Sequence, residues 1–142
     1  MSLADDARGF SWLLSSFVEQ TAGVTDAVAV SSDGLLMAMS SSLERASAEQ
    51  VAAIISGLVS LGHGASQCFG FDGLEQMIVA MRRGLLLVAS ISDGSCIGVV
   101  ARKGCDIGLV GYQMTLLVER AGAVLTPALV TELKHEMLAS AR

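Results

Sequence analysis

The stretch GVTDAVAVSSDGLLMA, residues 23–38, carries the pattern of a β-hairpin. Runs rich in aliphatic residues, at 24–30 and 35–39, flank the pair Asp33-Gly34. An Asp-Gly pair favours a tight hairpin turn because glycine adopts positive φ at little steric cost. The sequence therefore predicts two antiparallel strands over 24–30 and 35–39.

Amphipathic helices are predicted on both sides of this hairpin. Before it, apolar side chains recur at the spacing of one helical stripe, with Gly23 as the expected terminator: Phe10, Leu13, Leu14, Phe17 and Val18 within 10–22. After it, SAEQ at 47–50 matches a capping box, in which Ser47 caps the amide of Gln50. We expect the helix that follows to run to about Cys68 with one apolar face: Val51, Ile54, Ile55, Leu58, Leu61 and Ala65.

Three more strands and two more helices complete the predicted order. Short aliphatic runs bounded by glycine-containing turns predict the strands: residues 74–81, 85–91 and 96–101. Asp106 is expected to cap a helix that ends at Gly122, and Thr126-Pro127 to open a last helix.

This order predicts an α/β (α+β) fold with a single antiparallel sheet of about five strands and helices on its faces. The elements follow as αββαβββα, plus an extra C-terminal helix at 126–141. We expect one domain over residues 1–142, with a core over 10–122.

A line of small residues follows the predicted long helix at spacings of three or four: Ala53, Gly57, Ser60 and Gly64. Small side chains let another backbone approach closely, which would offset the helical cost of each glycine, up to about 1 kcal/mol. The same glycines equally fit a helix that ends or bends at residues 62–64. The sequence leaves both interpretations open.

The composition indicates apolar surface buried between copies of the chain. Hydrophobic residues make up 52% of the 142 positions and aromatic residues only 4%. An aliphatic surplus in a short chain points to a membrane span or to an oligomer. The longest stretch without Asp, Glu, Lys or Arg, residues 51–71, is interrupted by serines, glycines, His63 and Gln67. We therefore expect an oligomer, no transmembrane segment and, without a signal peptide at the N-terminus, a cytoplasmic protein.

Charge and cysteine usage exclude further classes. The net charge of −5 and the scattered basic residues argue against a nucleic-acid partner. Cys68, Cys96 and Cys105 fit no metal or redox spacing, so we expect reduced thiols packed as small apolar groups.

No combination of residues marks a catalytic centre, a cofactor site or a metal site. His63 and His135 have no further ligand at metal-binding spacing, and nucleophile-elbow, P-loop and dinucleotide-binding glycine motifs are absent from the sequence. Arg82-Arg83 could act as an arginine finger toward a nucleotide, but a solvated hairpin tip is the favoured interpretation. We predict that the protein is not an enzyme.

The hairpin at 23–38 resembles the signature hairpin of the roadblock/dynein light-chain family, and the predicted order of elements agrees from about Phe10 to Gly122. The resemblance implies a homodimer in which the third strands, here residues 74–81, join edge to edge while the long helices pack together. The implied dimer interface comprises Ala53, Gly57, Ser60, Gly64, Met77, Ile78, Val79 and Ala80.

The resemblance also implies a function. Family members bind small Ras-like GTPases, and bacterial members related to a gliding-motility polarity regulator stimulate GTP hydrolysis without an arginine finger. His63, Arg82 and Arg83 are the residues we expect to contact such a partner. The helix at 126–141 is additional to the family pattern. The alternative is a ligand-sensing domain of the PAS or GAF kind, which usually lines a pocket with aromatic groups that are scarce here.

Overall fold

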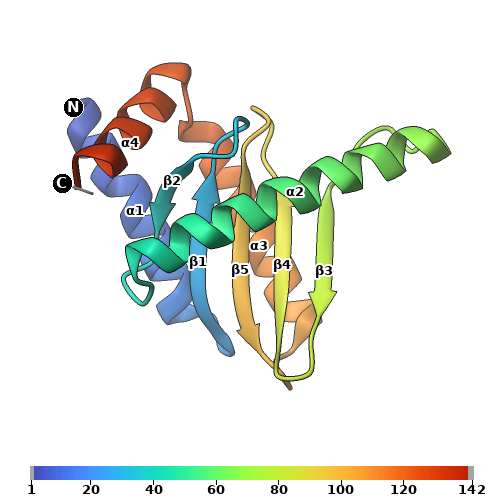
Figure 1. Ribbon diagram of the computed structural model, residues 1–142. Coiled ribbons are helices and arrows are strands. Elements are labelled where there is room, and N and C mark those ends of the chain that lie inside the picture. Colours follow the sequence, from blue (N-terminus) through green and yellow to red (C-terminus); the bar gives the residue numbers. More distant parts are fainter. Residues whose placement is uncertain (1, 141–142) are drawn as a thin grey trace.

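The computed structural model describes residues 2–140, which form four helices and one five-stranded sheet (Figure 1). In chain order the elements are α1 (Leu3–Gln20), β1 (Val24–Val30), β2 (Leu36–Met39), α2 (Arg45–Phe69), β3 (Gln76–Ala80), β4 (Gly84–Ser90), β5 (Cys96–Arg102), α3 (Ile107–Val124) and α4 (Pro127–Ser140). The predicted fold class and element order are confirmed.

The strands form one antiparallel sheet in the order β2-β1-β5-β4-β3. In the hairpin between β1 and β2, Gly34 takes a φ of 85°, and the Leu35 backbone N–H donates to Ser31 Oγ at 3.2 Å. This hydrogen bond holds Leu35 in the turn, so β2 begins at Leu36. Because β1 also pairs with β5, the hairpin occupies one edge of the sheet and β3 the other.

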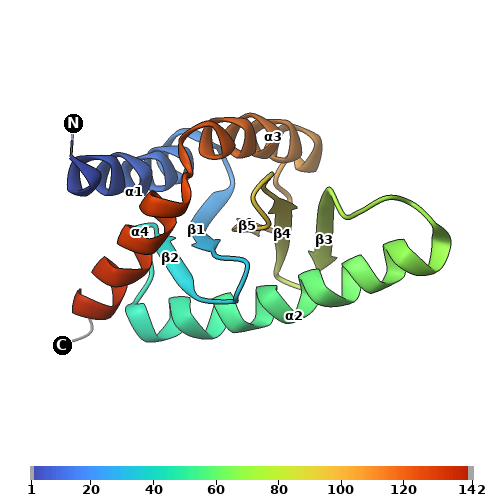
Figure 2. The same ribbon diagram turned by 90° about the horizontal axis from the view of Figure 1, so that it is seen from above.

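Helices cover both faces of the sheet (Figure 2). On one face, α1 and α3 bury a cluster that includes Phe10, Leu14, Met114 and Leu117. On the other face, α2 lies across the strands and buries Ala48, Ala52 and Ile55. The small side chains on this side of α2 let its backbone lie close to the sheet.

The last helix, α4, covers the β2 edge (Figures 1 and 2). Its Leu129 and Leu133 are buried in the cluster beneath α1, and Lys134 Nζ lies 3.2 Å from Asp33 Oδ2 in the β1–β2 turn. Although β2 is an edge strand, its residues 36–38 are buried. The additional helix therefore shields an edge that would otherwise be open.

Two predicted helix starts are wrong. The capping box at Ser47 does not form, because α2 begins at Arg45 with Glu44 at its N-cap position. The Ala48 N–H donates to the Glu44 carbonyl at 2.9 Å, so the first turn is already formed before Ser47 could cap it. α1 likewise begins at Leu3, well before the expected start at residue 10.

Two glycines predicted as helix terminators serve close packing instead. Gly23 follows an α1 that ends at Gln20; its φ is 88°, and a Cβ there would lie 2.6 Å from Cys105 Cβ. Gly122 lies inside α3, which continues to Val124, and a Cβ there would lie 3.2 Å from a hydroxyl in the turn after β4. Sequence spacing cannot distinguish a glycine that ends a helix from one that admits a neighbouring segment.

Replacing Gly98 of β5 by alanine should destabilise the fold. The added Cβ would lie 2.2 Å from Cδ1 of the fully buried Ile55, so that the end of this side chain would have to move within a closely packed core. We expect a loss of about 1–2 kcal/mol in the free energy of unfolding, measured by urea denaturation.

The matched control is Gly108→Ala in the first turn of α3, where a Cβ makes only ordinary contact. Helix propensity should raise its stability by up to about 1 kcal/mol. Equal stability of both variants and the parent would contradict the close packing of α2 on β5.

Candidate interaction surface

The β3 edge is open to solvent along its outer side. Within residues 2–140, β3 pairs only with β4. Met77 and Val79 are half-buried toward α2, whereas Ile78 is 46% exposed and Ala80 is exposed on the other face of the strand. This edge therefore combines unpaired backbone groups with apolar side chains, which is the usual template for pairing with another strand.

The long helix passes directly over β3. A Cβ at Gly62 would lie 2.8 Å from Leu74 and 2.9 Å from Met77, so the absence of a side chain at Gly62 is what allows this approach. α2 runs without a break through Gly62-His63-Gly64 to Phe69, and Gly70 closes it in the left-handed conformation. Of the two interpretations that the sequence left open, the one in which the helix ends at residues 62–64 is wrong, and the expected extent to about Cys68 is confirmed.

The outward face of α2 carries the predicted line of small residues. Ala53, Gly57 and Ser60 are exposed and Gly64 is half-buried. A Cβ at Gly57 or Gly64 would meet nothing within 4 Å, so no other segment within residues 2–140 fills the space that these glycines leave. Only the C-terminal part of this line lies at the β3 edge, where Gly62 of α2 approaches Met77 (Figure 1). Ala53, at the other end of the line, lines a recess with Leu36 of β2 and Met137 of α4.

The predicted apolar face of α2 is partly wrong. Ile55 packs on the sheet, but Ile54 and Leu61 point into solvent, with 51% and 74% of their surface exposed. The contact with the sheet uses Ala48 and Ala52 instead, because small residues fit the close approach there. α2 is consequently apolar on two sides: one face lies on the sheet and the other is uncovered in the single chain.

With apolar residues on two faces and a length of 25 residues, α2 is long and apolar enough, by length and composition alone, to cross a membrane. Its most hydrophobic window has a mean hydropathy of 1.3, and 17% of that window is buried within the chain. The bent pair of α3 and α4 passes the same test together. α2 nevertheless lies across the sheet, packed along one face (Figure 2).

An aromatic pair marks the end of α2, which projects beyond β3 (Figure 1). The rings of Phe69 and Phe71 stack with centroids 5.4 Å apart, and both side chains are mostly exposed. The pair extends the uncovered apolar surface past the sheet. The sequence analysis did not identify this pair, although two aromatic residues on either side of Gly70, in a chain with few aromatic residues, could have indicated an exposed contact.

The three expected partner contacts do not form one patch. His63 is exposed on α2 and lines a recess with Ser66 and Asp72 near the start of the loop to β3. Arg82 and Arg83 are exposed in the β3–β4 turn, at the opposite end of β3 from that loop. Any partner that touches all three residues must therefore span the length of the strand.

The thiols differ in their surroundings. Cys68 is exposed on α2, so the expectation that it packs as a small apolar group is wrong, whereas Cys96 is buried. Burial raises the pKa of the Cys96 thiol to about 11, and the nearby Asp93 carboxylate adds to the shift. Among residues 2–140, no group of three or more His, Cys, Asp and Glu side chains is placed to hold a metal ion.

The family model of the Roadblock/LC7 domain matches residues 10–101 of this chain. The chain belongs to the Roadblock/LC7 family. Two solved roadblock domains from Streptomyces avermitilis share 36% and 34% sequence identity with it, with TM-scores of 0.74 and 0.65. Each match covers 78% of this chain, and 92% and 95% of the respective domains. No curated protein sequence matches the chain.

More distant roadblock structures share the fold. MglB of Myxococcus xanthus superposes with a TM-score of 0.75 at 12% identity, covering 82% of this chain and 94% of MglB. The gliding protein MglB of Thermus thermophilus gives a TM-score of 0.73 at 13% identity, covering 87% and 91%. The matched family region ends within β5, so α3 and α4 lie beyond it.

Alkylation should separate the thiols of the folded protein. At pH 8, iodoacetamide should modify Cys68 readily, while Cys96 should react only when the chain unfolds, because its buried thiol remains neutral. The folded protein keeps the Cys96 proton at pH values where the unfolded chain has lost it, because the pKa is raised from 9.0 to about 11. The stability that Cys96 contributes is therefore fully present below pH 9.0 and is lost as the pH rises toward about 11.

Mass spectrometry of the cysteine peptides over time measures both rates, and the same reaction in urea gives the unprotected rate of Cys96. Equal labelling of Cys68 and Cys96 in the folded protein would contradict this arrangement.

Proposed function

We propose that the chain works as a homodimeric, non-enzymatic adaptor that binds a small Ras-like GTPase and modulates its GTP hydrolysis or localisation. Membership of the Roadblock/LC7 family and the fold shared with MglB support a GTPase-associated regulatory role. The observation that carries the proposal is the open, apolar β3 edge lying beside the uncovered face of α2.

A second copy covers this surface most simply by pairing β3 with β3 about a twofold axis. Antiparallel pairing supplies hydrogen-bond partners to the outer backbone groups of both strands. It also brings the two α2 helices together, where Gly57 and Gly64 leave room for a neighbouring backbone. Each Å² of apolar surface buried in this way contributes about 25 cal/mol.

The two edges of the sheet differ in a way that would limit such strand pairing to two copies. α4 shields β2, so a dimer joined through β3 presents no second open edge to a third copy. The additional C-terminal helix would therefore limit the assembly to a closed pair.

The nucleotide in this proposal belongs to the partner. In this proposal the adaptor acts by contact with the GTPase, whose own groups carry out the hydrolysis. His63, Arg82 and Arg83 remain the candidate contacts, and their separation implies a partner that spans the edge of the dimer. A cytoplasmic location, where Ras-like GTPases meet GTP, is part of the same proposal.

Replacing Ile78 by lysine should convert the dimer to a folded monomer. The variant places a charge at the centre of the paired edge, where it would be buried without a partner. Light scattering should give half the mass of the parent protein, while circular dichroism stays unchanged.

The matched control is Leu35→Lys, at a residue that is exposed to a similar degree but lies in the β1–β2 turn, away from β3. It should remain a dimer. A parent protein that is monomeric, or an Ile78→Lys variant that keeps the parent mass, would overturn β3 pairing.

Binding should depend on the nucleotide state of the partner. A Ras-like GTPase from the same genome should co-elute with this protein when loaded with a non-hydrolysable GTP analogue and not when loaded with GDP. Turnover of GTP with and without the adaptor separates activation from scaffolding. The double variant R82A/R83A should change turnover by less than about tenfold, because an arginine finger would contribute about 10³-fold or more.

Co-elution with neither nucleotide state, in a preparation that is dimeric, would contradict the adaptor role while leaving the dimer intact.

A further inference from the structure

The two ends of β3 carry charges of opposite sign. Arg82 and Arg83 are exposed in the turn that follows β3, whereas Asp72 and Glu75 are exposed in the loop that precedes it (Figure 1). Within residues 2–140, none of these four side chains takes part in an ion pair. The open edge of the sheet therefore has a basic end and an acidic end.

The loop that carries the two carboxylates is attached to the end of α2. The Gly73 N–H donates to Ser66 Oγ at 2.6 Å, and the Phe71 N–H donates to the Ser66 carbonyl at 2.9 Å. Asp72 lies between these two bonds and lines an open recess together with His63. Two hydrogen bonds thus tie the acidic end of the edge to the helix that passes over β3.

The hydrogen bonds between β3 and β4 determine which backbone groups of β3 face outward. At one end the Ser90 N–H donates to the Glu75 carbonyl at 3.0 Å. At the other end the Met81 N–H donates to the Gly84 carbonyl at 2.8 Å. Because the bonded residues alternate along an antiparallel strand, the N–H and C=O groups of residues 75, 77, 79 and 81 point toward β4.

The backbone groups of Gln76, Ile78 and Ala80 consequently point away from the sheet. In an antiparallel pair of two β3 strands these residues must lie opposite one another to exchange hydrogen bonds. Among twofold-symmetric registers, only a pair centred on Ile78 gives every outward residue of β3 such a partner, with Gln76 opposite Ala80 of the second copy. The backbone therefore favours this centred register.

Pairing about Ile78 places the basic end of each strand beside the acidic end of the other. Arg82 comes level with residue 74 of the second copy and Arg83 with residue 73. Asp72 and Glu75 of that copy are one or two residues away, at most about 7 Å along the chain, a distance that an arginine side chain bridges. The twofold axis repeats the contact at the other end of the strands, whereas parallel strands would set like charges against each other.

We propose that Arg82 and Arg83 of each copy form ion pairs with Asp72 and Glu75 of the other, and that these pairs fix the direction and register of the β3–β3 contact. The inference rests on the β3 pairing of the proposed function. Strand pairing by itself permits slipped registers, and charges at both ends disfavour them. Arg82 and Arg83 are also candidate contacts for the GTPase, so the turnover test with R82A/R83A requires a concentration at which that variant is dimeric.

Reversing the basic end should weaken the dimer. In R82E/R83E both ends of the edge are negative, so the dissociation constant should rise at least about tenfold, since each exposed ion pair contributes up to about fivefold. Added salt should reduce this difference because it screens the repulsion. Sedimentation equilibrium at low and at high salt measures both effects.

The complementary variant is D72N/E75K, which removes one carboxylate and reverses the other. Asparagine suits position 72 because Asp72 has a φ of 66°, a conformation that Asn also tolerates. This variant should likewise dimerise poorly by itself. Mixed with R82E/R83E it should form heterodimers, because each turn then faces charges of opposite sign, and native mass spectrometry distinguishes these from homodimers by mass.

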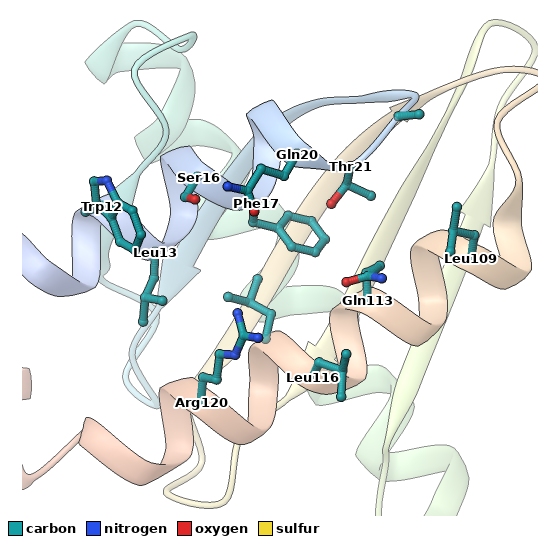
Figure 3. Close-up of a pocket in the computed structure, with 12 residues that line it drawn as sticks. Trp12, Leu13, Ser16, Phe17, Gln20, Thr21, Leu109, Gln113, Leu116 and Arg120 are labelled. Atoms are coloured by element: carbon teal, nitrogen blue, oxygen red, sulfur yellow. The ribbon is translucent and has the colours of Figure 1, made fainter.

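The matched control is R8E/R120E, which changes the net charge by the same amount at exposed residues of α1 and α3. Arg120 lines a groove between these helices, together with Trp12 and Leu109, and no residue of β3 contributes to that groove (Figure 3). The control should dimerise like the parent protein.

The ion pairs alone are overturned if the parent is a dimer and R82E/R83E dimerises as tightly as R8E/R120E. They are equally overturned if the mixture of R82E/R83E and D72N/E75K forms no heterodimer. A monomeric parent protein would overturn β3 pairing itself, and the ion pairs with it.

Discussion

The outer backbone groups of β3 have no hydrogen-bond partner within residues 2–140, and this open edge determines how the protein can associate. An edge strand in water keeps its outer N–H and C=O groups solvated, but apolar side chains beside them favour pairing with another strand. The two edge strands of this sheet, β2 and β3, differ in how far they are covered. α4 buries β2, whereas Ile78 of β3 lies in solvent on the face of the sheet opposite to α2. The outer face of α2 also exposes Ile54 and Leu61. In the dimer that we propose, one open edge and one shielded edge would favour a closed pair over a fibre.

The sequence was sufficient for the fold because its strongest patterns are local. Asp33-Gly34 sets the hairpin, and helical or alternating periodicity sets the other elements, so the five-stranded sheet and the helix order follow. The surfaces were harder to predict. An aliphatic helix shows two apolar stripes, and periodicity alone cannot tell which stripe meets the sheet. The missing side chain of Gly98 leaves room for Ile55 of α2, and these two residues are 43 positions apart in the chain.

The many aliphatic residues of the chain are divided between the core and its exposed surfaces. One part fills the two core clusters on either side of the sheet. Another part lies on the outer face of α2 and along β3, and a third on the rim of the α1–α3 groove. The hydropathy of α2 thus comes from two faces, one packed on the sheet and one exposed in the single chain. Of the six aromatic residues, Phe10 and Phe17 are buried in the core, whereas Trp12, Phe69, Phe71 and Tyr112 are exposed.

Amide hydrogen exchange across residues 76–80 tests the central claim most directly. Alternate amides of β3 point away from β4, and they have no hydrogen-bond partner unless a second strand lies alongside. At micromolar and higher concentrations we predict that all β3 amides are protected from hydrogen exchange. In the Ile78→Lys variant, every second β3 amide should lose this protection. Outward-pointing β3 amides that exchange in the parent protein as fast as a free peptide would contradict it.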